Sequence, residues 1–116
     1  MIEEILLNFL TARLSCPVDM ELPKNPPAEI VIIEKTGSSQ DNNFIHQSTF
    51  AIQSYANSLY NAARLNEEVK DTLLDGLDGF ITVDNVTKIE LNSDYNFTDT
   101  STKKYRYQAV FDITHY

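Results

Sequence analysis

The sequence has few of the residues on which small catalytic or metal sites are built. In 116 residues it contains one cysteine, three glycines, two histidines and no tryptophan. A single cysteine, Cys16, cannot form an internal disulfide, which fits a reducing compartment. Three glycines do not supply a glycine-rich phosphate loop, and no Cys or His residues are paired at metal-ligand spacing. We therefore predict that the protein has no cofactor and no bound metal.

Positive charge is also scarce. Nine Lys and Arg residues stand against 17 Asp and Glu residues, which gives a net charge of −8. Nucleic acid bound on the surface needs concentrated Lys and Arg, so this balance argues against it, although DNA passing nearby is compatible. No apolar run is long enough to cross a bilayer. Glu3 and Glu4 stand where a signal peptide is positively charged, so we expect synthesis in the cytosol and no membrane segment.

The polar residues do not form a recognisable catalytic motif. His46 and His115 are far apart in the sequence, and we expect them to be surface or capping residues. Asp84, Asp94 and Asp99 lack the ligand spacing and the central glycine of a calcium loop, and turn chemistry accounts for them. Since no group is placed to act as acid, base or nucleophile, we predict that the protein is not an enzyme.

Two segments have the periodicity of amphipathic helices. Residues 2–14 carry an apolar stripe made of Ile2, Ile5, Leu6, Phe9 and Leu10. A second stripe, in which apolar residues recur at steps of three or four, comprises Leu59, Ala62, Leu65, Val69 and Leu73. Asn57 or Ser58 can cap this second helix, and Gly76 and Gly79 mark its end.

The other apolar segments predict strands. A short strand is expected over 18–22, and four successive β-branched residues within 28–36 indicate a central strand buried on both faces. Residues 49–55 form a strand that leads directly into the second helix. Ile81 and Val83 are expected to begin an edge, and the strict alternation of 105–114 predicts the second strand of a hairpin with 86–95. The order predicts one α+β domain over 1–116, with two helices packed on one face of a largely antiparallel, mixed sheet.

Several of these segments together resemble one protein family. They are an amphipathic first helix, a short proline-bounded strand, EIVIIEKTG at Glu29–Gly37, TFAIQSYANSLYNAA at Thr49–Ala63, and Asn92–Ile113 with its DYNFTDT turn and YRYQAVFDI strand. The resemblance covers nearly the whole chain. It is to the tail-terminator, or tail-to-head joining, proteins of long-tailed phages and of prophages in Gram-positive bacteria.

The resemblance implies a structural protein of the virion tail or neck, assembled in the host cytoplasm. Such proteins form a ring, with a homo-hexamer expected, at the head-proximal end of the tail tube. The ring stops tube polymerisation and joins the tail to the connector or completion protein of the head. The implied partners are therefore further copies of the chain, the tube protein and the connector, while DNA passes through the lumen without specific binding.

Two polar segments are the candidate contact regions of such a ring. The first has almost nothing apolar to bury, so we expect a long mobile loop that reaches a neighbouring subunit or the lumen; it comprises Gly37, Ser38, Ser39, Gln40, Asp41, Asn42 and Asn43. The second is the turn of the last hairpin, which we expect to reach a partner ring; its candidate residues are Asp94, Asn96, Thr98, Asp99, Lys103 and Lys104.

Two other functions remain open on the sequence alone. One is another neck component, such as a head-completion protein, which binds the connector without capping tubes. The other is a small host-factor-binding regulatory module, whose acidic surface mimics nucleic acid. Tube length in the absence of the protein distinguishes the first alternative from a tail terminator. A stable monomer that retains a host partner distinguishes the second.

Overall fold

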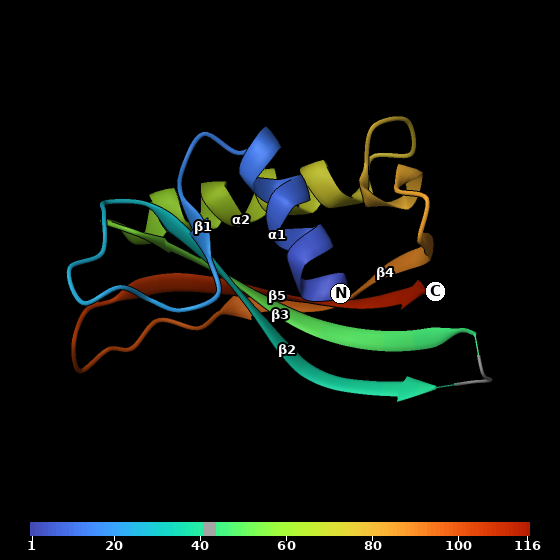
Figure 1. The fold of residues 1–116 in the computed structure, drawn as a ribbon. Helices are drawn as coiled ribbons and strands as arrows, with labels where there is room; N and C mark the ends of the chain where they lie inside the picture. Colours follow the sequence, from blue (N-terminus) through green and yellow to red (C-terminus); the bar gives the residue numbers. More distant parts are fainter. Residues whose placement is uncertain (41–43) are drawn as a thin grey trace.

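One mixed sheet with two helices on one of its faces forms the domain. The computed structural model describes residues 1–40 and 44–116. Its helices are α1 (Ile2–Arg13) and α2 (Leu59–Leu74), with a short 3₁₀-helix η1 (Phe80–Thr82), and its strands are β1 (Val18–Asp19), β2 (Ile30–Gln40), β3 (His46–Ala56), β4 (Val86–Asn96) and β5 (Tyr105–His115). The strand order is β1-β2-β3-β5-β4 (Figure 1). Only β1 and β2 pair in parallel, and the predicted α+β architecture is confirmed.

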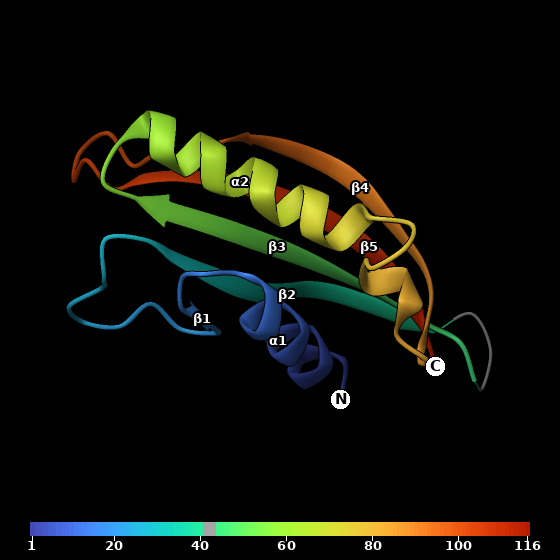
Figure 2. The same ribbon diagram turned by 90° about the horizontal axis from the view of Figure 1, so that it is seen from above.

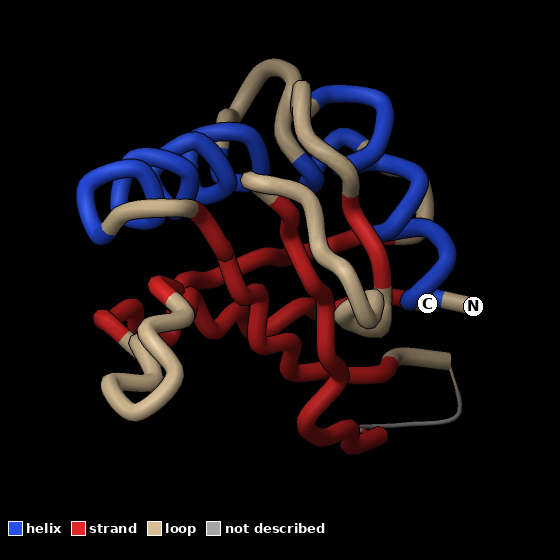
Figure 3. Tube along the Cα trace, turned by 90° about the vertical axis from the view of Figure 1, so that its left-hand side faces the viewer, coloured by secondary structure: helices blue, strands red, loops and turns tan. Residues whose placement is uncertain are grey.

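Both helices cover the same face of the sheet and lie side by side (Figure 2). The other face carries no helix in the part of the chain that the structure describes (Figure 3). Helix α2 begins as predicted, because the Ser58 hydroxyl accepts a hydrogen bond from the Asn61 backbone N–H at 3.1 Å. Its inward side buries Ala62, Leu65, Val69 and Leu73. Leu59 was expected on this side but is 41% exposed at the first position of the helix.

A 3₁₀ turn replaces the edge strand that we expected to begin at Ile81 and Val83. The Thr82 backbone N–H and hydroxyl both donate to the Gly79 carbonyl, at 3.0 and 2.7 Å, which turns the chain locally. The turn places the fully buried Phe80 edge-on against Phe9 of α1, with 5.1 Å between the ring centroids. The segment therefore joins α1 to the core instead of extending the sheet.

The alternation predicted for β5 is confirmed. Ala109, Phe111 and Ile113 have no exposed surface and lie in the core beneath the helices. In β2 the four residues from Ile30 to Ile33 are buried, as predicted for a strand covered on both faces. Within the described residues this strand has a neighbour on each side at Val31 and Ile32, as expected for a central strand, but beyond these two residues its outer side has no paired strand.

Strand β1 is shorter than the predicted strand over 18–22. It pairs with Val31 and Ile32 of β2, and the Val31 N–H donates to the Pro17 carbonyl at 3.0 Å. The Asp19 carboxylate then accepts a hydrogen bond from the Met20 N–H at 2.7 Å, which turns the chain away from the sheet. Consequently, among the described residues, most of β2 has no neighbouring strand on its outer side.

Candidate functional site

The first predicted contact region is not a loop where the structure describes it. Gly37 to Gln40 form the end of β2, where Ser38 and Ser39 pair with Ser48 and Gln47 of β3. Backbone hydrogen bonds hold a strand together without apolar side chains, which is why the polar composition misled the prediction. All four residues are exposed. The remaining residues of this predicted region, Asp41, Asn42 and Asn43, lie outside the described residues.

The second predicted region divides between a strand and a turn. Asp94 and Asn96 belong to β4, which extends further than expected because Asn96 still pairs with Tyr107 of β5. Asp94 also forms an ion pair with Lys70 of α2 at 3.2 Å, so its side chain faces the helix layer. This ion pair and the one between Lys70 and Glu67, at 2.6 Å, raise the pKa of Lys70, with the hydrogen bond to Glu67 as the main cause.

The hairpin tip proper contains Thr98, Asp99, Lys103 and Lys104. The Asn96 side-chain oxygen accepts the Thr98 N–H at 3.0 Å, and an isolated bridge joins Asp99 to Lys104. Lys103 has a φ of 54°, the left-handed conformation that a tight turn requires. The tip is therefore an ordered turn with two exposed lysines. Thr98, Asp99, Lys103 and Lys104 lie between β4 and β5, as predicted for the hairpin turn.

Asp99 is the residue that organises this tip. One of its carboxylate oxygens accepts from the Ser101 N–H at 3.0 Å and from the Ser101 hydroxyl at 2.7 Å. Hydrogen bonds from Ser101, and then from Thr102, lower the pKa of the Asp99 carboxyl. Because the carboxylate form is the one stabilised, the tip gains order above the ordinary carboxyl pKa and loses it as pH falls through the lowered value.

We therefore expect the amide resonance of Ser101 to shift with acid at a pH below the ordinary carboxyl range, as Asp99 becomes protonated. The measurement is an NMR titration of the amide and of the Asp99 carboxyl carbon. In the Asp99→Asn variant the side chain cannot ionise, so the Ser101 shift should be absent. An unchanged acid shift in that variant would show that another group orders the turn.

The two regions lie at opposite ends of the sheet. Gln40 pairs with His46 of β3, and His46 pairs in turn with His115 at the end of β5. The hairpin tip, in contrast, directly precedes Tyr105 at the start of β5. The longest dimension of the molecule is 44 Å. The structure thus does not bring the two candidate regions together, and it separates them along the strand direction (Figure 1).

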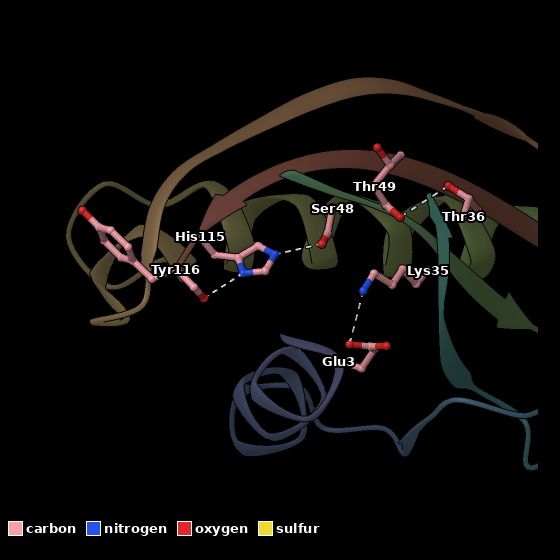
Figure 4. A network of polar contacts seen from close by, with 7 residues as sticks. All are labelled: Glu3, Lys35, Thr36, Ser48, Thr49, His115 and Tyr116. Atoms are coloured by element: carbon pink, nitrogen blue, oxygen red, sulfur yellow. Dashed lines mark hydrogen bonds and ion pairs between the residues drawn. The ribbon is translucent and has the colours of Figure 1, made fainter. Parts of the chain in front are cut away.

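A cleft beside the end of β5 was not foreseen from the sequence. His46 and His115 face each other across β3 and β5, with stacked rings whose centroids are 5.7 Å apart. Figure 4 shows His115 between Ser48 and the Tyr116 backbone, and Lys35 near Glu3 at 3.7 Å. The cleft has a volume of about 290 Å³. It arises from residues far apart in the sequence, which no local pattern relates.

The geometry of this cleft assigns His115 a structural role. The Tyr116 carbonyl can only accept, so Nδ1 of His115 carries the proton of that 3.1 Å hydrogen bond. In the neutral ring Nε2 then accepts from the Ser48 hydroxyl at 2.8 Å. Ser48 is 1% exposed and His115 8%, so the hydroxyl is not accessible to a substrate. The surface or capping role expected for His115 was therefore wrong, because cross-strand pairing buries the ring.

The face of the sheet opposite the helices carries a chain of side-chain hydrogen bonds. Gln53 of β3 donates to Gln108 of β5 at 3.0 Å, and Gln108 donates to the Tyr95 hydroxyl of β4. The Tyr55 hydroxyl donates to Gln53 at 3.0 Å and accepts from the Arg106 guanidinium at 2.7 Å. These bonds cross three strands of this face, the open face, and satisfy one another's donors and acceptors, since Gln53 and Gln108 are only 9% and 8% exposed.

Among the residues that the structure describes, no three His, Cys, Asp or Glu side chains are grouped to hold a metal ion. Half-buried Cys16 has a raised pKa, caused chiefly by burial and then by Glu29. No helix within 1–40 and 44–116 has the length and apolarity to cross a membrane.

No family model matches the chain, and no curated protein matches it either.

Proposed function

We propose that this chain is a structural protein of a long-tailed phage that forms a ring at the head-proximal end of the tail tube. In this role it stops tube polymerisation and joins the tail to the head connector. The proposal begins from the resemblance of Glu29–Gly37, Thr49–Ala63 and Asn92–Ile113 to the tail-terminator family. It implies a homo-hexamer in the neck of the virion, through which DNA passes without specific binding.

The observation that best supports this function is the separation of two polar contact regions by the length of one rigid sheet. The exposed end of β2 lies at one end and the ordered hairpin tip at the other. A joining protein needs two such surfaces, because the tube and the connector lie on opposite sides of the ring. The side-chain network on the open face supports the same role by keeping the sheet rigid between them.

The distribution of acidic residues does not indicate which face of the sheet lines the lumen of the ring. Glu67 and Glu68 of α2 are each within reach of a cation, Lys70 at 2.6 Å and Arg64 at 3.6 Å. The open face mixes both signs, since Lys88 and Glu90 form an ion pair at 3.1 Å near Asp112. Either face of the sheet therefore presents a surface to which DNA does not adhere strongly, because the net charge of −8 repels phosphate throughout.

The direct test is the length of tail tubes polymerised in vitro from purified tube protein. Added at the start, this protein should shorten the tubes and appear as a ring at one end in electron micrographs, and capped tubes should then bind purified connectors. Tubes of unchanged length that still recruit connectors through this protein would identify another neck component. A protein that binds neither tubes nor connectors would overturn the proposal.

A further inference from the structure

Two long strands of the sheet, β2 and β4, have an outer side that is unpaired along most or all of its length in the described part of the chain. In the described part of the chain, β2 is bordered on its outer side only by β1, which pairs with Val31 and Ile32 alone. From Glu34 to Gln40 every residue of β2 is exposed. At the opposite side of the sheet, β4 is the last strand in the order. Each copy thus presents two rows of backbone donors and acceptors.

The directions of these strands determine how two copies can meet. β2, β3, β5 and β4 are antiparallel in succession, so β2 and β4 run in opposite directions. A second copy that continues the sheet, with its helices on the same side and in the same orientation, therefore places its β4 antiparallel to β2 of the first. Antiparallel pairing is the slightly more stable arrangement per residue. The same relation repeats at every junction, which is the requirement for a ring.

The composition of the β2 edge also favours pairing. Soluble proteins usually protect an exposed edge with charges, proline or bulges. Beyond its single bulge between Lys35 and Gly37, β2 ends in Ser38, Ser39 and Gln40, which carry no charge and include no proline. The bulges of the three long antiparallel pairs occur only in β2 and β4, whereas β3 and β5 pair without a register shift. Bulges bend a strand and increase its twist, which supplies curvature where neighbouring copies join.

We propose that the outer edge of β2 at Gly37–Gln40 pairs antiparallel with the outer edge of β4 in a second copy of this chain. The sheets of neighbouring copies then form one continuous surface around the ring, and closure gives every copy the same two junctions. This inference rests on the proposed function and specifies its subunit interface. Because β1 blocks further pairing at Ile32, each junction is short. A short junction gives weak association, which a tube end can template.

Ser39→Lys tests the β2 edge, and the chain supplies a matched control. Ser39 and Gln47 are directly paired, are both exposed and point to the same face, but Gln47 lies in β3, which has a strand on each side. Lysine at position 39 blocks edge pairing, whereas lysine at position 47 adds the same charge away from the edge. The measurement is molar mass by light scattering across concentration. We expect wild type and Gln47→Lys to associate alike and Ser39→Lys to need a roughly tenfold or higher concentration.

A second variant establishes which edge is the partner. Thr87 of β4 is exposed and is skipped in the β4–β5 register, so Thr87→Lys changes the β4 edge and removes one side-chain hydrogen bond, from the Thr87 hydroxyl to the Thr114 carbonyl at 3.1 Å. At a concentration where the wild type associates, Ser39→Lys and Thr87→Lys should each be monomeric, and a 1:1 mixture should stop at a pair, because only one intact junction remains. Thr87→Lys that associates like wild type would overturn the proposal and indicate a twofold β2–β2 contact, which closes after two copies.

The same variants on tail tubes separate this inference from the function on which it rests. If wild-type protein forms rings only at tube ends, Ser39→Lys should fail to cap tubes while Gln47→Lys caps them. Ser39→Lys that caps tubes as wild type does would overturn the edge pairing and leave the tail-terminator function intact. Wild-type protein that neither associates nor caps would overturn both. Thermal unfolding of each variant monomer confirms that the fold is retained.

Discussion

Gly79→Ala is expected to destabilise the protein by about 2–4 kcal/mol, a large effect for the addition of one methyl group. A Cβ atom at position 79 would lie 2.0 Å from the Asp75 carbonyl oxygen and 2.8 Å from both the Asp75 nitrogen and the Leu73 carbonyl oxygen. All three are backbone atoms, which cannot rotate away as a side chain does. The φ of Gly79 is −80°, so the requirement for glycine comes from this close approach and not from a left-handed conformation.

The strain at Gly79 extends into the core through its neighbours in the chain. Phe80, the next residue, is fully buried against Phe9 of α1, and Thr82 is held by the Gly79 carbonyl. Moving position 79 away from the end of α2 therefore displaces an aromatic side chain that joins both helices. The measurement is the free energy of unfolding from urea denaturation at a protein concentration where the chain is monomeric.

Gly76→Ala is the matched control for this prediction. Gly76 lies three residues earlier in the same loop, nothing stands within 4 Å of the position of its Cβ, and no glycine has a positive φ among the described residues. Alanine restricts the unfolded chain there, so this variant should be neutral or more stable by up to about 1 kcal/mol. Equal effects of the two substitutions would show that the loop relaxes around the added methyl group.

The parts of the fold that the sequence predicted are those with local periodicity. Ala109, Phe111 and Ile113 alternate with polar residues, and the period of two specifies a strand with one buried face. The three- and four-residue spacing of Ala62, Leu65 and Val69 similarly specifies the inner side of α2. The hydroxyl of Ser58 directly before this pattern marks the helix start.

The parts that were missed depend on partners distant in the sequence. Ser38 and Ser39 are in a strand because β3 lies beside them, and their own side chains carry no signal for it. The residue type of Asp94 predicts a turn, although it lies in β4, where the Lys70 side chain of α2 pairs with it. The two candidate regions could be named from polarity, but their positions at opposite ends of the sheet require the strand register.

The second large loss of stability is expected from Phe111→Ala, which truncates a residue on the buried face of β5. Phe111 has no exposed surface, lies in the helix-side core and pairs with Phe50 on β3 and Leu91 on β4. Truncation of a buried phenylalanine leaves a cavity between three strands and the helices, and it costs about 3–5 kcal/mol. This is a large share of the roughly 5–15 kcal/mol by which small domains are typically stable, so the unfolding midpoint in urea should fall sharply.

Val110→Ala is the control, because Val110 is the adjacent residue on the opposite face of β5 and is only half-buried. No helix of the described residues covers that face, so the truncation leaves no closed cavity, and we expect a loss of about 1 kcal/mol or less. A loss at Val110 as large as that at Phe111 would contradict a core confined to the helix side. If the Val110 loss grew with protein concentration, burial of the open face on association would be the physical reason, since assembly stabilises only the folded chain.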